Sequence, residues 1–82
     1  MVNLSYGGAY SSKISMRLRL PEVTLGVGQL GPEFIILSQP SDHPPTEAIM
    51  EMTIDDEEES WRVSLPEGIS SNMVRVPMIA LE

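Results

Sequence analysis

Apolar and polar residues alternate along the first patterned part of the chain, residues 13–27. In residues 13–20 every second side chain is apolar: Ile14, Met16, Leu18 and Leu20. This period of two predicts a strand with one buried face. Pro21 cannot donate a hydrogen bond to a neighbouring strand, so it ends this strand, and the alternation over residues 23–27 predicts a second, shorter one.

A compact apolar run follows after a glycine-rich stretch. Phe34 to Leu37 contains four consecutive apolar residues, which predicts a central strand covered on both faces. Residues 39–46 contain three prolines. Because the residue before a proline is disfavoured in helical conformation, this segment predicts an extended loop on the surface.

The clearest alternation lies in residues 47–65. Apolar side chains recur at every second position in two runs: Ala48, Met50, Met52 and Ile54, then Trp61, Val63 and Leu65. The runs predict a β-hairpin whose loop is the acidic stretch Asp55 to Glu59. Thr46 to Met52 also holds a possible helix cap and good helix formers. The alternation through Ile54 and the absence of an i, i+3, i+4, i+7 apolar stripe favour the strand.

The end of the chain predicts one more strand. Val74, Val76, Met78 and Ala80 alternate, and Pro77 places this strand at an edge of the sheet. The fold class is therefore all-β: a small antiparallel sheet, barrel or sandwich of five to six short strands. We expect a single β domain over residues 13–82, preceded by a flexible N-terminal arm, residues 1–12, in which glycines and serines show no periodicity.

Length and charge exclude several classes of function. Eighty-two residues provide for one core, and with no cysteine and one histidine neither disulfides nor a four-ligand zinc site can reinforce it. The formal net charge of −7 opposes binding to nucleic acid or to an anionic membrane. The start of the chain lacks the basic and apolar regions of a secretory signal, so we expect a cytoplasmic location.

Two motifs could bind a ligand, and each has a simpler explanation. Gly26, Gly28 and Gly31 spell GxGxxG after a strand, but no helix can follow, so we interpret them as a β-loop that needs positive φ. The acidic residues of the hairpin loop lack the spacing of a calcium site. We expect a solvated turn there, with docking of a basic partner as the alternative: Asp55, Asp56, Glu57, Glu58 and Glu59.

A catalytic role is not expected, and neither is a cofactor or a metal. His43 lies between Asp42 and Pro44 on an extended segment, where neighbouring side chains diverge, whereas a catalytic triad converges from separate elements. We expect an exposed loop histidine. A chain of this size also has little room for a pocket of ordinary ligand size, so we do not expect a small-molecule ligand.

The apolar C-terminal strand is the leading candidate for contact with a partner. Trp61 is predicted to anchor the core, and of the methionines only Met73 and Met78 are predicted at the surface. Edge strands can pair with another chain. We therefore expect self-association or a partner strand through residues 72–81, with these contact residues: Met73, Val74, Val76, Met78, Ile79 and Leu81.

Residues 30–68 carry a resemblance. Their glycine-proline turn, apolar strand, proline-rich loop and acidic-tipped hairpin ending in LPEG resemble short uncharacterised bacterial β-domain proteins, which implies no activity. The layout is also similar to the PilZ family of six-stranded β-barrels. Lys13 to Arg17 gives only KxxxR in place of RxxxR, and the family's DxSxxG motif has no counterpart, so cyclic dinucleotide binding is not implied.

These observations predict a non-enzymatic protein-interaction or structural domain that uses an edge strand or its acidic surface. The alternative is a small ligand-binding, PilZ-like barrel without the usual nucleotide motifs.

Overall fold

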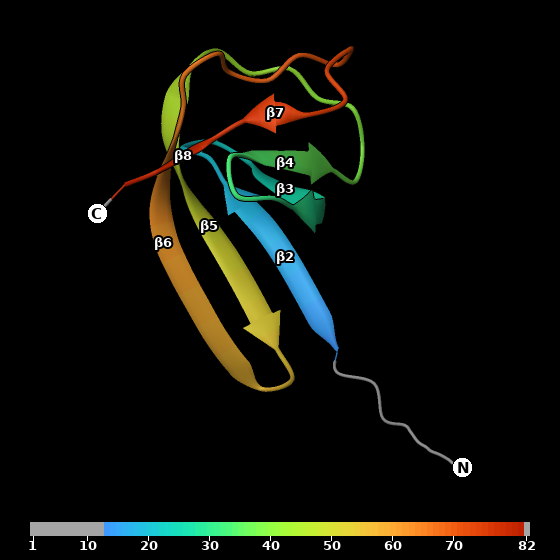
Figure 1. Ribbon diagram of the computed structural model, residues 1–82, viewed down its shortest axis with the longest axis vertical. Coiled ribbons are helices and arrows are strands. Elements are labelled where there is room, and N and C mark those ends of the chain that lie inside the picture. Colours follow the sequence, from blue (N-terminus) through green and yellow to red (C-terminus); the bar gives the residue numbers. More distant parts are fainter. Residues whose placement is uncertain (1–12, 82) are drawn as a thin grey trace.

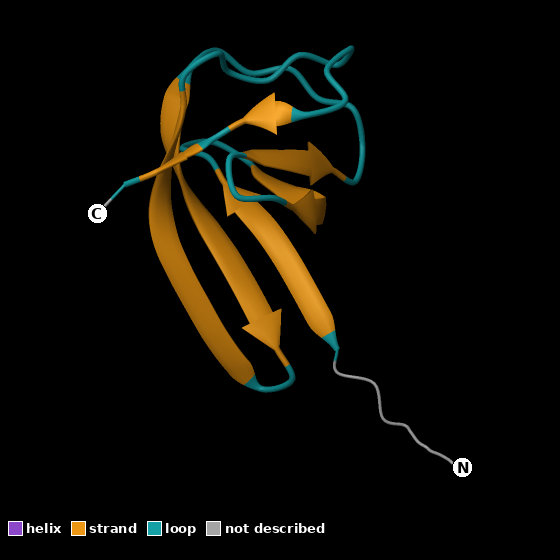
Figure 2. Ribbon diagram, in the orientation of Figure 1, coloured by secondary structure: helices purple, strands orange, loops and turns teal. Residues whose placement is uncertain are grey.

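The computed structural model describes residues 13–81, and within them the protein is all-β, as the alternation predicts (Figures 1 and 2). The predicted arm, residues 1–12, lies outside the described residues. The strands are β2 (Ile14–Arg19), β3 (Thr24–Leu30), β4 (Phe34–Leu37), β5 (Thr46–Ile54), β6 (Glu57–Leu65), β7 (Val76–Pro77) and β8 (Ile79–Ala80). They form one sheet in the order β7-β4-β3-β2-β5-β6-β8, and every pairing is antiparallel.

The β5–β6 hairpin and β2 form the longest part of the sheet. Nine residue pairs join β5 to β6, from Thr46 opposite Leu65 to Ile54 opposite Glu57. β2 lies on the other side of β5, with Ile14 opposite Ile54 and Leu18 opposite Met50. The hairpin prediction is confirmed, and the helical alternative for Thr46 to Met52 is wrong.

The C-terminal segment nearly closes the sheet into a barrel. β7 pairs with β4, and after the single residue Met78 the chain pairs with β6 as β8. Figure 1 shows this segment crossing from β4 to β6. The sequence predicts one strand at one edge. The structure instead has two very short strands, one at each end of the sheet order. Pairing with the β4 side continues through Pro77 to Met78, whose N–H donates to the Glu33 carbonyl, and the chain then joins β6.

The core fills the inside of this barrel-like sheet. Six side chains have essentially no solvent exposure, and they come from β2, β4, β5, β6 and β7: Leu18, Ile35, Met50, Val63, Leu65 and Val76. Trp61 is half-buried and packs against this cluster, consistent with its predicted role. Among the described residues, no polar or charged side chain is buried in the core.

Two local expectations are wrong. β4 is not covered on both faces, since only Ile35 is fully buried and the strand lies next to the end of the sheet order. Gly26 and Gly28 lie within β3, and none of the GxGxxG glycines has a positive φ. Close packing explains Gly31 instead, because a Cβ there would collide with the ring of Phe34.

Candidate functional site

Part of the sheet extends beyond the nearly closed barrel, which we call the closed part. β3 pairs only with Arg17 to Arg19 of β2, and β8 pairs only with Val63 and Ser64 of β6. We call the three-stranded remainder the protruding sheet: residues 14–16 of β2, 52–54 of β5 and 57–61 of β6. Figure 1 shows it as the lower part of the molecule, with β5 between β2 and β6.

The face of the protruding sheet that continues the core is apolar. Side chains alternate between faces, so those in register with buried Leu18 and Met50 share the inner face. We define the apolar face by these residues: Ile14, Met16, Met52, Ile54 and Trp61. Ile14 is 59% exposed and Ile54 is 38% exposed, whereas Met16 and Trp61 also touch the core. The row of apolar side chains that fills the barrel therefore continues along the same face to positions exposed to solvent.

The turn at the end of the hairpin is shorter than the sequence predicts. Asp55 and Asp56 alone form it, while Glu57, Glu58 and Glu59 belong to β6 and pair with β5. Asp55 has a φ of 55°, a left-handed conformation that aspartate tolerates better than most residues. Its N–H donates to the Lys13 carbonyl at 2.9 Å, so it also extends the contact with β2. Strand pairing leaves only the two aspartates free of the ladder between β5 and β6.

The acidic residues divide between the two faces of β6. Glu57 and Glu59 lie in the inner-face alternation with Trp61 and stand opposite Ile54 and Met52, while Glu58 faces the other side. Their side chains are exposed. No group of three or more acidic, histidine or cysteine side chains in residues 13–81 is arranged to hold a metal ion. The acidic residues thus form a negative rim along one side of the apolar face.

Within residues 13–81, part of the outer edge of β6 has backbone groups that no other strand pairs with. Leu81 N–H donates to the Arg62 carbonyl at 2.8 Å, so the backbone groups of Arg62 point toward β8. Because these groups alternate sides along an antiparallel strand, those of Ser60 and Glu58 point the same way. Within the described chain no strand pairs with that edge from Glu57 to Ser60. This edge and the apolar face adjoin each other.

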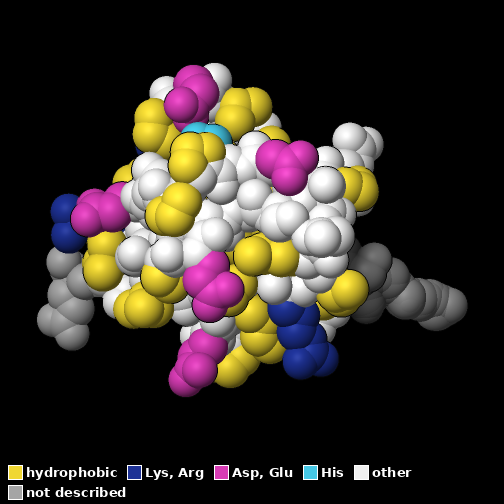
Figure 3. All heavy atoms as spheres, turned by 90° about the horizontal axis from the view of Figure 1, so that it is seen from above, with side chains coloured by type: hydrophobic (Ala, Val, Ile, Leu, Met, Phe, Trp, Pro, Cys, Tyr) yellow, Lys and Arg dark blue, Asp and Glu magenta, His cyan; other side chains and the backbone are white. Residues whose placement is uncertain are grey.

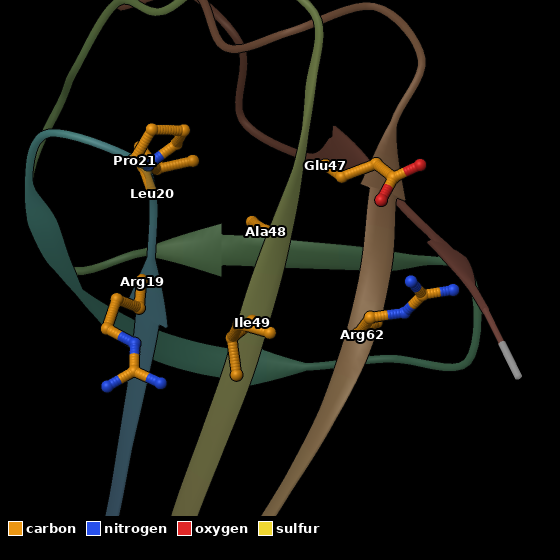
Figure 4. Close-up of a pocket in the computed structure, with 7 residues that line it drawn as sticks. All are labelled: Arg19, Leu20, Pro21, Glu47, Ala48, Ile49 and Arg62. Carbon is orange, nitrogen blue, oxygen red and sulfur yellow. The ribbon is translucent and has the colours of Figure 1, made fainter.

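The opposite face of the same sheet carries arginines around a shallow hollow. Glu51 accepts from Arg17 Nε at 3.2 Å and from an Arg19 guanidinium nitrogen at 3.1 Å. The hollow, about 360 Å³, is lined by Arg19, Leu20, Pro21, Glu47, Ala48, Ile49 and Arg62. In Figure 4 the Arg19 and Arg62 guanidinium groups point away from each other across Ile49. Convergent polar groups, which orient a small ligand, are therefore not formed here.

His43 lies at the other end of the molecule and is not the exposed loop residue that we expect from sequence. Its side chain is 11% exposed, and Figure 3, which looks down on this end, shows only a small part of it. Nε2 lies 2.7 Å from Glu22 Oε1 and Nδ1 lies 2.7 Å from the Pro44 carbonyl oxygen, and both partner oxygens are hydrogen-bond acceptors. Its backbone also pairs with Ile69. The proline-rich loop is thereby attached to two other segments.

The contacts of His43 shift two pKa values. Its hydrogen bond to Glu22, followed by that to the Pro44 carbonyl, raises the pKa of His43 above 6.5. The same contact with His43 lowers the pKa of Glu22 below 4.5. Since both ring nitrogens face acceptors, the protonated imidazole satisfies both bonds at once. This arrangement supports the loop.

The predicted C-terminal contact residues do not form one surface. Val76 and Met78 are buried in the core, so the expectation of a surface Met78 is wrong. Met73 is half-buried against the core. Val74 is 75% exposed and Ile79 is 55% exposed, but they border different hollows, and Leu81 is partly exposed.

Sequence reasoning assigned the residues of the apolar face to the core. A signal was available: Glu57 and Glu59 occupy the same alternating positions as Trp61, Val63 and Leu65. Acidic side chains are almost never fully buried without partners. Their presence on the core-facing side indicates that this end of the sheet leaves the core.

Comparison with known proteins adds no family to this description. No family model, no curated protein and no solved structure matches the chain. Within residues 13–81 the structure has no helix able to cross a membrane. Any functional argument therefore depends on the site itself.

Proposed function

We propose that the protein is a non-enzymatic interaction domain that binds a partner protein through the apolar face of the protruding sheet. The observation that supports this proposal is the continuation of the core-facing side chains past the closed barrel. Ile14 and Ile54 stand directly opposite each other there and remain exposed. Adjacent exposed apolar side chains beside a polar rim are typical of protein interaction sites.

The charges at the rim favour a basic partner. Asp55, Asp56 and Glu57 to Glu59 surround one end and one side of the apolar face, in a chain with net charge −7. A partner with apolar side chains flanked by lysine or arginine complements both features and is attracted over a distance at low salt. A second copy of this chain brings the same acidic rim and is repelled. The occupant is accordingly a basic, partly apolar segment of another protein.

The binding can be tested by photo-crosslinking followed by measurement with purified proteins. A photo-reactive amino acid at position 54 should capture a partner in cell extract, whereas the same group at position 23, an exposed apolar position on the closed part, should not. The captured protein is then purified and its affinity measured by calorimetry. Ile54→Lys should weaken binding at least tenfold, because it places a charge in the buried contact, while Val23→Lys should leave it unchanged.

Three results would contradict the proposal. Equal capture from positions 54 and 23 would mean that the apolar face is not selective. Equal affinity of the purified partner for the wild type and Ile54→Lys would mean that this face is not the contact. A dimer of this chain alone, detected by light scattering and abolished by Ile54→Lys, would replace the proposed partner with a second copy.

A further inference from the structure

We infer that the partner binds as an added β-strand along the free edge of β6, antiparallel to it, with basic side chains opposite Glu57 to Glu59. This inference rests on the proposed function and specifies how its partner is held. It concerns the edge of the protruding sheet, whereas the proposal above concerns the face. The two contacts adjoin, so one segment can occupy both.

The position of the added strand is defined by β8. In β8, Ile79 stands opposite Ser64 and Ala80 opposite Val63, and Leu81 N–H donates to Arg62 O. The described part of the chain thus follows the β6 edge as far as Arg62 and leaves the rest of that edge unpaired. A partner strand that continues the same line runs antiparallel to β6 and meets Ser60 first and Glu57 last.

Backbone geometry determines where the hydrogen bonds form. The N–H and C=O groups of Ser60 and Glu58 point outward from β6, in step with those of Arg62. A partner residue opposite each of them exchanges both backbone bonds, while the residues opposite Glu59 and Glu57 have none to exchange with β6. Main-chain bonds of this kind give affinity without selecting a sequence, so selection must come from the side chains.

The side chains opposite the strand select its chemistry. Partner residues opposite Glu59 and Glu57 lie on the inner face, and the residue opposite Glu58 lies on the outer face. Lysine or arginine at all three places forms cross-strand pairs of opposite charge. On the inner face, the aliphatic stem of the residue opposite Glu59 also lies beside Trp61, its diagonal neighbour on β6. The recognised segment is therefore a short basic strand.

The acidic residues also oppose pairing of this edge with the same edge of a second copy. An open strand edge is a template for aggregation, and charged side chains are one of the ways in which proteins prevent it. Two copies of β6 placed edge to edge would bring Glu57, Glu58 and Glu59 of each chain together. Like charges directly opposite each other are destabilising. The same residues that exclude a second copy therefore select a basic strand.

The test uses a synthetic peptide and nuclear magnetic resonance. The probe is the blocked peptide Ile-Thr-Lys-Arg-Lys-Val, titrated into the full 15N-labelled chain at low salt, and its matched control has glutamate in place of the three basic residues. The largest amide shifts should fall on Glu58 and Ser60, and the control peptide should cause none. Raising the salt concentration should weaken binding several-fold, since the added pairs are exposed to solvent.

Two substitutions at one position isolate the backbone contact. Ser60→Pro removes an outward N–H that β5 does not use, so the hairpin should keep its spectrum while peptide binding is lost. Ser60→Ala retains the N–H and should bind as the wild type does. Glu58→Lys, which leaves the backbone unchanged, should weaken binding at least tenfold. Binding as an added β-strand predicts all three results together.

Failure of this inference can be distinguished from failure of the proposed function. If Ser60→Pro folds and still binds the purified partner while Ile54→Lys does not, binding as an added strand is overturned and the apolar-face proposal stands. If the peptide shifts no amide in the protruding sheet, binding as an added strand is overturned as well. If the purified partner binds both variants as tightly as the wild type, both are overturned.

Discussion

The nearly closed barrel and the protruding sheet share three strands, β2, β5 and β6, and the same alternation, yet their side chains meet opposite environments. Leu18 and Met50 have no solvent exposure, whereas Ile14 and Ile54, on the same face of the same two strands, are exposed. The difference arises from β3, β4, β7 and the loops, which cover one end of β2, β5 and β6 and stop before the other. An apolar side chain at a strand position contributes to stability only where another layer covers it.

Hydrogen bonds also hold the loops together at the closed end. His43 and Ile69 exchange backbone hydrogen bonds, and the Asp42 carboxylate accepts from the Ser71 N–H at 2.9 Å. At the protruding end, contacts of this kind join Asp55 to Lys13: the Asp55 N–H donates to the Lys13 carbonyl, and the Lys13 N–H donates to the Asp55 carboxylate. We therefore expect stability to depend on the closed end and binding to depend on the protruding one.

The largest predicted difference compares two apolar truncations in one strand. Leu18→Ala should lower the free energy of unfolding by about 2–5 kcal/mol, because it opens a cavity in a filled core. Ile14→Ala should change it by no more than about 0.5 kcal/mol, as is usual for surface positions. Equilibrium urea unfolding measures both. Similar losses for the two variants would mean that the protruding sheet is covered in solution.

A second comparison concerns two glycines. Gly68 has a φ of 66°, and a Cβ there would collide with the backbone of His43 and Pro44. Gly68→Ala should therefore cost about 1–3 kcal/mol of stability. Gly28→Ala is the control, because its Cβ would make only ordinary contacts, and it should cost less than about 1 kcal/mol. Equal thermal shifts in the two variants would show that the loop junction at Gly68 is not tightly packed.

The hydrogen bond between His43 and Glu22 should make the stability of the closed end depend on pH. The raised pKa of His43 gives a contribution that is complete below pH 6.5 and is lost as pH rises through the higher folded value. The lowered pKa of Glu22 gives one that is complete above pH 4.5 and is lost as pH falls through the lower folded value. Both contributions to stability are complete between about pH 5 and 6.

Melting temperatures of the wild type and Glu22→Gln across pH 4 to 9 provide the measurement. The difference between the two should be greatest in that window and should shrink toward alkaline pH. The matched control is Glu33→Gln, another acidic loop residue, whose difference from wild type should not follow the His43 titration. If the difference in melting temperature between Glu22→Gln and the wild type were constant over the whole pH range, the contribution of this hydrogen bond would be contradicted.

The smallest predicted effect lies at the protruding tip. Like charges from Asp55 to Glu59 repel one another, so moderate salt should raise the melting temperature by screening them. Glu58→Gln should raise stability by a few tenths of a kcal/mol at low salt, and the gain should vanish at high salt. A melting temperature that falls between low and moderate salt would contradict this explanation.

The sequence by itself determined the all-β class, the hairpin and the identity of its inward side chains. These properties depend on local alternation, since a period of two assigns each side chain of a strand to one face. The break at Pro21 and the strand character of Thr46 to Ile54 also follow from local chemistry. Sequence could not show where the covering layer ends, although Glu57 and Glu59 gave an indication of it.

The tertiary structure alone decided which part of the apolar face is a core and which part is a surface. Pairing of the C-terminal segment with both β4 and β6 joins residues far apart in the chain, and it buries Val76 and Met78 while leaving Ile14 and Ile54 exposed. The register of β6 with β5 likewise shows that Glu57 to Glu59 belong to a paired strand and that the turn has two residues. Burial depends on which distant segments meet, and alternation along the chain carries no information about that.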